Sequence, residues 1–182
     1  MKNQTIVKKN LNYFLLFFVL PVTAMLWWWG LFSSASLEVT TSPAYDYVYL
    51  DAEGPYSKLA SKQDEVLFYL KQQNIPHQAS LTLVMTDPRT TPYKSLLART
   101  GFVVSADTTV KEPLKLGHLD AQKVVVTQIK AHPLLAYGKT YSKLLDYCKS
   151  HDMKLKLPTV EIFERSVLRV EMPLDDKAEL AN

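Results

Sequence analysis

The chain has 182 residues, of which 47% are hydrophobic and 21% charged, and its formal net charge is +3. This length accommodates one domain and an appendage, since domains commonly contain about 100–150 residues. The basic excess comes from Lys2, Lys8 and Lys9, because from residue 33 onward 18 basic residues balance 18 acidic ones. A neutral domain lacks the basic surface that nucleic acids require, so we expect no nucleic-acid partner.

The N-terminal part divides into a basic segment, residues 1–12, and an apolar run, residues 13–32. This run contains 20 residues without a charge, and a helix of that length crosses the hydrocarbon layer of about 30 Å. It predicts a single transmembrane helix that acts as a signal-anchor. The alternative is a cleaved signal peptide, but its apolar core usually has only about 7–15 residues. The lysines before the run predict a cytoplasmic N-terminus and a domain on the opposite side, periplasmic or extracellular in a bacterium.

Beyond the apolar run, residues 33–44 are predicted to form a polar tether. Residues 45–50 alternate with period two and predict a strand, whereas residues 56–73 carry the apolar stripe of a helix. Two further strands are expected over residues 79–85 and 99–105. The second half repeats this order, with a strand, a helix and two strands expected at residues 123–129, 139–151, 160–164 and 168–172.

The two halves can also be overlaid residue by residue. Residues 69–75 then lie on residues 147–153, and with the same offset Leu81–Met85 lies on Thr159–Phe163. The sequence therefore predicts an α+β fold of two β-α-β-β units, with a mainly antiparallel sheet and two helices on one face. We expect this domain to cover residues 45–174, followed by a tail over residues 175–182.

The last two strands form a predicted hairpin that carries the candidate site. A two-residue turn would point Glu161 and Glu171 to opposite faces, and a three-residue loop would point them to the same face. Only the odd loop collects the apolar residues on one face, so we expect the three-residue loop. Four side chains then share the open face of the sheet, namely Glu161, Phe163, Arg169 and Glu171.

A row of tyrosines is expected beside these acids. In the first strand the alternation places Tyr45, Tyr47 and Tyr49 on the same open face. Aromatic walls around a carboxylate suit an apolar or cationic organic molecule, through cation–π and apolar contacts. The seven hairpin and tyrosine residues are our predicted ligand-binding site, and the open alternative is a polar face that only contacts water.

Other chemistry has little support in the sequence. The chain has one cysteine, Cys148, and its four histidines lack metal-ligand spacing, so we expect no metal site. None of the five glycines forms a phosphate-binding or nucleophile motif. We therefore expect no cofactor and identify no catalytic residue. The segment Asp87-Pro88-Arg89 is typical of a turn.

Several short motifs, taken in order, resemble the GyrI-like small-molecule-binding domain of AraC- and MerR-type effector-binding proteins. They are Gly54-Pro55-Tyr56, Asp87-Pro88-Arg89 with Pro92 and Arg99, Glu161-Ile162-Phe163, and Glu171-Met172-Pro173-Leu174. The resemblance implies a duplicated β-α-β-β fold with a ligand cavity between its halves. It also implies that Glu171 or Glu161 is the acid that contacts the ligand.

These observations predict a membrane-anchored module that binds a small apolar or cationic organic molecule. Two alternatives remain open. The first is a protein-interaction adaptor at a membrane, which would use the open face or the loop of residues 87–97. The second is a small-molecule hydrolase, in which a glutamate with a raised pKa activates water. Binding without turnover is the reading that the sequence favours.

Overall fold

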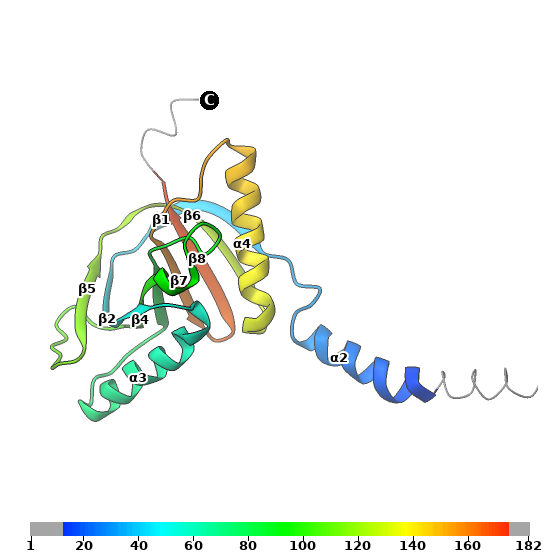
Figure 1. The fold of residues 1–182 in the computed structure, drawn as a ribbon, viewed down its shortest axis with the longest axis horizontal. Coiled ribbons are helices and arrows are strands. Elements are labelled where there is room, and N and C mark those ends of the chain that lie inside the picture. Colours follow the sequence, from blue (N-terminus) through cyan, green and yellow to red (C-terminus); the bar gives the residue numbers. More distant parts are fainter. Residues whose placement is uncertain (1–12, 175–182) are drawn as a thin grey trace, which may run out of the picture.

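The protein forms one eight-stranded antiparallel sheet that two long helices cover on one face (Figure 1). The structure is a computed structural model, and it describes residues 13–174. The strands follow each other across the sheet in the order β1-β6-β8-β7-β3-β4-β2-β5. Their bounds are β1 Ser36–Ser42, β2 Tyr45–Glu53, β3 Ser80–Val84, β4 Leu97–Val103, β5 Lys115–Leu119, β6 Gln122–Lys130, β7 Thr159–Glu164 and β8 Val167–Pro173.

Two β-α-β-β units build this sheet, as the internal repeat predicted. The first unit contains β2, α3 (Leu59–Gln72), β3 and β4, and the second contains β6, α4 (Pro133–Ser150), β7 and β8. Short 3₁₀ turns precede α3 at Tyr56–Lys58 and β4 at Tyr93–Ser95. The units meet where β3 pairs with β7, and the strand order is symmetric about that pair. A local two-fold axis therefore relates the two halves of the domain.

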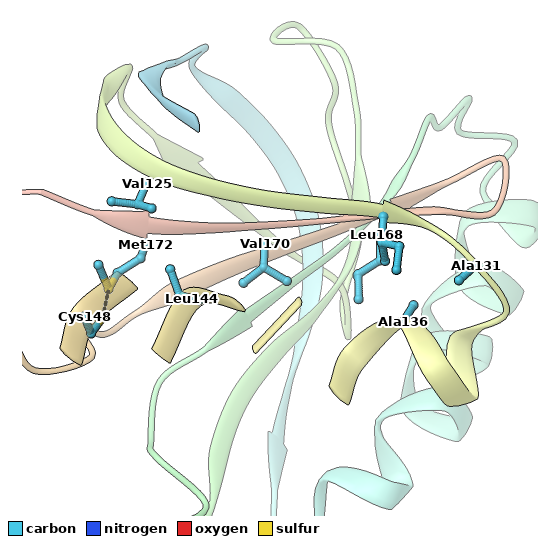
Figure 2. Close-up of a cluster of buried hydrophobic side chains, with 9 residues drawn as sticks. Val125, Ala131, Ala136, Leu144, Cys148, Leu168, Val170 and Met172 are labelled. Atoms are coloured by element: carbon cyan, nitrogen blue, oxygen red, sulfur yellow. Dashed lines mark hydrogen bonds between the residues drawn. The ribbon is translucent and has the colours of Figure 1, made fainter. Parts of the chain in front are cut away.

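The helices pack on what we call the helix face of the sheet. Val66 and Leu70 of α3 contact Val48 and Leu50 of β2. Figure 2 shows the corresponding cluster in the second unit, where strand residues point toward α4; it comprises Val125, Ile129, Ala131, Ala136, Leu144, Cys148, Leu168, Val170 and Met172. Burial of these side chains drives the docking of both helices, because each fully buried aliphatic side chain contributes about 1.5–3 kcal/mol.

The helix ends confirm the overlay of residues 69–75 on residues 147–153. Asn74 follows α3 with a φ of 56°, and Asp152, its predicted equivalent, follows α4 with a φ of 51°. Both residue types tolerate the left-handed conformation that ends helices. The α4 helix begins at Pro133, before the residue 139 that we predicted, because the His132 side chain accepts the Leu134 N–H at 3.3 Å.

Two strands were missed, and both lie at edges of the sheet. Residues 33–44, predicted to be a tether, contain β1, which pairs with β6 from Ser36↔Gln128 to Ser42↔Gln122. Strand β5 likewise pairs with β2. Edge strands with one exposed side carry a weak apolar alternation, so the pattern did not separate them from loops.

Residues 13–32 do not form the single long transmembrane helix that we predicted. The helical stretch comprises η1 Leu15–Val19 and α2 Leu20–Trp28, and it extends away from the sheet (Figure 1). Within residues 13–174, no helix combines the length and apolar character that a bilayer crossing needs. The helix stops because Gly30 has a φ of +86°.

The C-terminal end of α2 is held against α4. The Lys139 ammonium donates to the carbonyl oxygens of Gly30 at 3.0 Å, Ser33 at 2.6 Å and Leu31. A cation at this position satisfies carbonyl groups that the helix leaves unpaired. Trp29 stacks on His132 with ring centroids 4.3 Å apart, and its carbonyl accepts the His132 N–H. The end of the apolar segment is therefore part of the folded domain.

The prediction for the C-terminal hairpin was wrong. Strands β7 and β8 are joined by the two-residue turn Arg165-Ser166, so Glu161 pairs with Val170 and Glu171 pairs with Val160. Glu161 consequently lies on the helix face, and Glu171 lies on the opposite face. The apolar pattern misled us because both faces of this sheet are buried.

Curvature of the sheet buries the second face. Tyr45 on β2 donates to Glu171 on β8 at 3.0 Å, although β4, β3 and β7 lie between these strands. In a flat sheet four strand spacings of about 4.8 Å would keep the two residues about 19 Å apart. This concave face holds a core of its own, in which Tyr47 and Tyr49 pack with Leu81, Leu83 and Val160. The face that we predicted to be open is therefore filled with side chains.

The hairpin turn offers a first test of the observed register. Arg165 and Ser166 have φ values of 48° and 67°, the conformation of a type I′ turn, which favours Asn-Gly. Replacing them by Asn and Gly should raise the free energy of unfolding by about 0.5–1 kcal/mol. Urea titration of the wild type and the double variant measures the change. A lower midpoint would show that the turn has a different conformation.

Candidate functional site

A cavity of about 520 Å³ lies between α3, α4 and the helix face of the sheet. Both units contribute to it, because its lining residues come from α3, β3 and β4 of the first unit and from α4 and β7 of the second. Its floor is made by strand residues, and its walls by the helices and two loops. The lining includes Tyr56, Leu59, Gln63, Thr82, Asp87, Arg89, Thr100, Tyr137, Tyr141, Leu145, Leu155, Leu157, Thr159 and Glu161.

Glu161 is the acid at the floor of this cavity. It projects from β7, and only 8% of its surface is exposed. The Tyr141 hydroxyl donates to its Oε1 at 2.6 Å and also lies 3.0 Å from the Thr159 hydroxyl. Burial raises the pKa of Glu161 from 4.5 to about 7, although the hydrogen bond from Tyr141 opposes the shift. The carboxyl group therefore changes its charge near neutral pH.

Three tyrosines surround the space above Glu161. Tyr141 and Tyr137 stand one helical turn apart on α4, and Tyr56 opens the first helix of the other unit. Burial and the Glu161 charge raise the pKa of Tyr137 to about 12, so its ring remains neutral. The Tyr56 hydroxyl is fixed by the Thr86 carbonyl at 2.7 Å and the Leu97 carbonyl at 3.0 Å. The walls are thus aromatic, and hydrogen bonds hold the hydroxyl groups of Tyr56 and Tyr141 in place.

A row of polar side chains continues the floor toward α3. Thr82 on β3 is the cross-strand partner of Glu161, and Thr100 on β4 is the partner of Thr82. The two threonine hydroxyls lie 2.9 Å apart. The Gln63 amide nitrogen donates from α3 to the Thr100 hydroxyl at 3.3 Å and to the Gly101 carbonyl at 3.4 Å.

The loop after β3 closes one side of the cavity. Asp87-Pro88-Arg89 forms the predicted turn, in which Asp87 Oδ1 accepts the Arg89 N–H at 2.9 Å. The Arg89 guanidinium also binds the Asp87 carboxylate, with Nη2 2.6 Å from Oδ2. This contact lowers the pKa of Asp87. Because the two charges neutralise each other, the wall adds little net charge to the cavity.

Of the seven predicted site residues, Glu161 alone lines the cavity. Phe163 lies on the same face but packs into the core beneath α4. Tyr47 and Tyr49 are buried in the core of the concave face, where the absence of a side chain at Gly117 leaves room for the Tyr47 ring. The other three, Tyr45, Arg169 and Glu171, form a separate group on that face.

That separate group is built on an ion pair between a buried carboxylate and a partly exposed guanidinium. Glu171 is 1% exposed, and its Oε1 accepts from Arg169 Nε at 2.6 Å and from the Tyr45 hydroxyl at 3.0 Å. Burial, and then the Glu171 charge, raise the pKa of Tyr45. The contacts satisfy the carboxylate within the protein. Glu171 therefore has the environment of a structural residue.

Sequence reasoning missed the walls of the cavity. Tyr141 lies in the helix predicted over residues 139–151 but was not among the predicted site residues, and Tyr56 was noted only in the motif Gly54-Pro55-Tyr56. Gln63, Thr82 and Thr100 carried no pattern of their own. One signal was available: polar or tyrosine side chains at helix and strand positions that should face a core mark a cavity.

A cavity between two repeated units, with apolar walls and one buried acid, is an arrangement typical of small-molecule-binding domains. The chain belongs to the family of GyrI-like small-molecule-binding domains, whose family model matches residues 36–172. That match includes β1, which we had placed outside the domain. No curated protein sequence matches the chain.

Solved structures share this fold at low sequence identity. The EcmrR C-terminal domain is 11% identical, with a TM-score of 0.63 over 78% of this chain and 98% of its own. SAV2435 bound to tetraphenylphosphonium is 8% identical, with a TM-score of 0.56 over 80% of this chain and 98% of its own. EcmrR in a complex with DNA is 10% identical, with a TM-score of 0.61 over 76% of this chain. The match covers only 57% of that EcmrR chain.

Proposed function

We propose that the cavity binds an apolar organic cation, and that the protein acts as a small-molecule-binding sensor module. The proposal is based on the position of Glu161. This acid is buried at the floor of an apolar cavity, and tyrosine side chains surround it. A buried carboxylate is costly unless a positive charge compensates it. No lysine or arginine contacts Glu161 among the interactions of residues 13–174, so a ligand can supply that charge.

The walls support a bulky aromatic ligand. Tyrosine rings attract a cation by about 0.5–2 kcal/mol when they face it within about 6 Å. A cavity of about 520 Å³ falls within the range of sites for drug-sized molecules, which is about 300–1,000 Å³. That SAV2435, a protein with this fold, is bound to tetraphenylphosphonium supports the same ligand class for this chain.

The proposal is tested by two ligands of one shape and opposite charge. The full chain in mild detergent is titrated with tetraphenylphosphonium and with tetraphenylborate, and heat is measured by calorimetry. We expect saturable binding of one phosphonium ion per chain and at least about tenfold weaker binding of the borate, because its charge would meet Glu161. Equal affinities, or partitioning without saturation, would contradict the proposal.

We also propose that the N-terminal segment attaches the domain to a membrane, with the N-terminus cytoplasmic and the domain on the opposite side. The uncharged run of residues 13–32 and the preceding lysines support this orientation. The exposure of its side chains, 89% for Trp28 and 72% for Phe17, is costly in water and favourable in lipid.

Fractionation tests the attachment. We expect a tagged full-length chain to remain with membranes after alkaline carbonate washing, and a chain that begins at residue 33 to be released. A C-terminal tag should be cleaved by protease added to the side opposite the cytoplasm. Release of the full-length chain would contradict the attachment, and cleavage only from the cytoplasmic side would contradict the orientation.

A further inference from the structure

The cavity contains a second polar position, which the two-fold axis relates to Glu161. Thr82 and Glu161 are direct partners across the central β3–β7 pair, so the axis between the units passes between them. Our overlay had placed Leu83 on Glu161, which is wrong by one residue, because equivalent residues must lie on the same face of the sheet. Each unit therefore contributes one residue to the cavity floor. In the second unit this residue is Glu161, which binds Tyr141 of α4. In the first unit it is Thr82, and Gln63 of α3, the equivalent of Tyr141 in the helix overlay, lines the same cavity.

The hydrogen bonds around Thr82 have one consistent direction. The Gly101 carbonyl can only accept, so the Gln63 amide must turn its nitrogen toward it, and the same nitrogen donates to the Thr100 hydroxyl. Thr100 is fully buried, and among residues 13–174 its hydroxyl has one further polar neighbour, Thr82. Thr100 consequently donates to Thr82, because its proton would otherwise be buried without an acceptor.

This direction leaves the Thr82 hydroxyl proton without an acceptor inside the described protein. Thr82 lines the cavity and is 8% exposed. Its proton can therefore be donated to a ligand, beside the carboxylate that receives the ligand's positive charge. Cross-strand partners have Cβ atoms about 4.5–5.5 Å apart. This spacing fits two polar groups on neighbouring atoms of one ligand.

We propose that Thr82 is a specificity-determining residue, and that the preferred ligand is a protonated amine with a hydrogen-bond acceptor on the adjacent carbon, such as an aromatic amino alcohol. The inference rests on the proposed function, because the ammonium group would bind Glu161. It goes beyond that function by distinguishing such amines from cations that carry no hydrogen-bonding group.

The test compares three ligands by calorimetry on the full-length protein: amino-diphenylethanol, the diphenylethylamine that lacks its hydroxyl, and tetraphenylphosphonium. The wild type should bind the amino alcohol about three- to tenfold more tightly than the matched amine, the effect of one hydrogen bond. Thr82→Val should abolish this preference. Thr82→Ser, which retains a hydroxyl, should keep the preference.

Thr127→Val is the matched control, because Thr127 is also a buried threonine but does not line the cavity. It should keep the preference for the amino alcohol. Two results would overturn the inference: equal affinities of the wild type for both amines, or a preference for the amino alcohol that survives in Thr82→Val. In either case, saturable phosphonium binding would still support the proposed function. If neither the amines nor the phosphonium bound, the proposed function itself would be refuted, and the inference with it.

Discussion

Glu161→Gln is expected to remove most of the affinity for a lipophilic cation at pH 8. The substitution keeps the shape of the side chain and the hydrogen bond from Tyr141 but removes the charge at the cavity floor. A buried charge pair contributes about 2 kcal/mol or more, so the affinity should fall by at least about 30-fold. Tetraphenylphosphonium titration measures this loss. Wild-type affinity should also fall below pH 7, by at most about tenfold for each pH unit, because Glu161 becomes protonated.

The same substitution should stabilise the unliganded domain at high pH. Burial raises the pKa of Glu161 from 4.5 to about 7, so between these values the folded protein holds a proton that the unfolded chain releases. The free energy of unfolding therefore decreases as pH rises through this window, by about 3 kcal/mol in total. Glutamine does not titrate, so Glu161→Gln should be more stable than the wild type by about that amount at pH 8 and nearly equal to it below pH 4.5.

Glu164→Gln provides the control for both measurements, because Glu164 ends the same strand but is exposed. It should change neither phosphonium affinity nor the pH dependence of urea unfolding. If Glu161→Gln bound the cation as tightly as the wild type, the acid would have no part in the site. If the stability difference were the same at both pH values, the buried carboxyl group would not hold a proton.

Arg169→Ala should destabilise the domain strongly and leave the ligand site intact. It removes the guanidinium that lies 2.6 Å from the Glu171 carboxylate and leaves that charge on the concave face with only the Tyr45 hydroxyl. Breaking a buried ion pair by removing one partner typically costs about 3–5 kcal/mol. Urea unfolding measures this loss, and phosphonium titration of the folded fraction should return wild-type affinity.

Two further variants test whether the stability loss of Arg169→Ala comes from the broken ion pair. Arg165→Ala removes an exposed arginine from the turn of the same hairpin and should change stability by no more than about 0.5 kcal/mol. Replacing Arg169 and Glu171 together by methionine and leucine should recover most of the loss, because no buried charge remains. Weaker phosphonium binding by folded Arg169→Ala would instead indicate that the concave-face group belongs to the ligand site.

The order of the elements could be predicted because each has a period of its own. The stripe on α3 that includes Val66 and Leu70, and the alternation in β2, are visible without any knowledge of the partners. The repeat made this prediction stronger, since a helix end at Asn74 implied one at Asp152. Edge strands β1 and β5 lack such a signal, because one side of each has no neighbour in the sheet.

The direction of the hairpin side chains could not be predicted in the same way. Alternation identifies the buried face only when the other face is exposed to water. Here Val160 and Ile162 pack on the concave face, and Leu168, Val170 and Met172 pack beneath α4, so both faces are apolar. The loop length that best grouped the apolar residues was therefore the wrong one.

The chain by itself determined the two β-α-β-β units, the apolar N-terminal segment and the presence of two acids in the last hairpin, because all three depend on local pattern and composition. Which acid faces the cavity, and which tyrosines surround it, was decided only by the tertiary structure. Sheet curvature and the separation of α3 from α4 arise from contacts between residues far apart in the chain, and they leave Glu161 beside an open space and Glu171 beside Arg169.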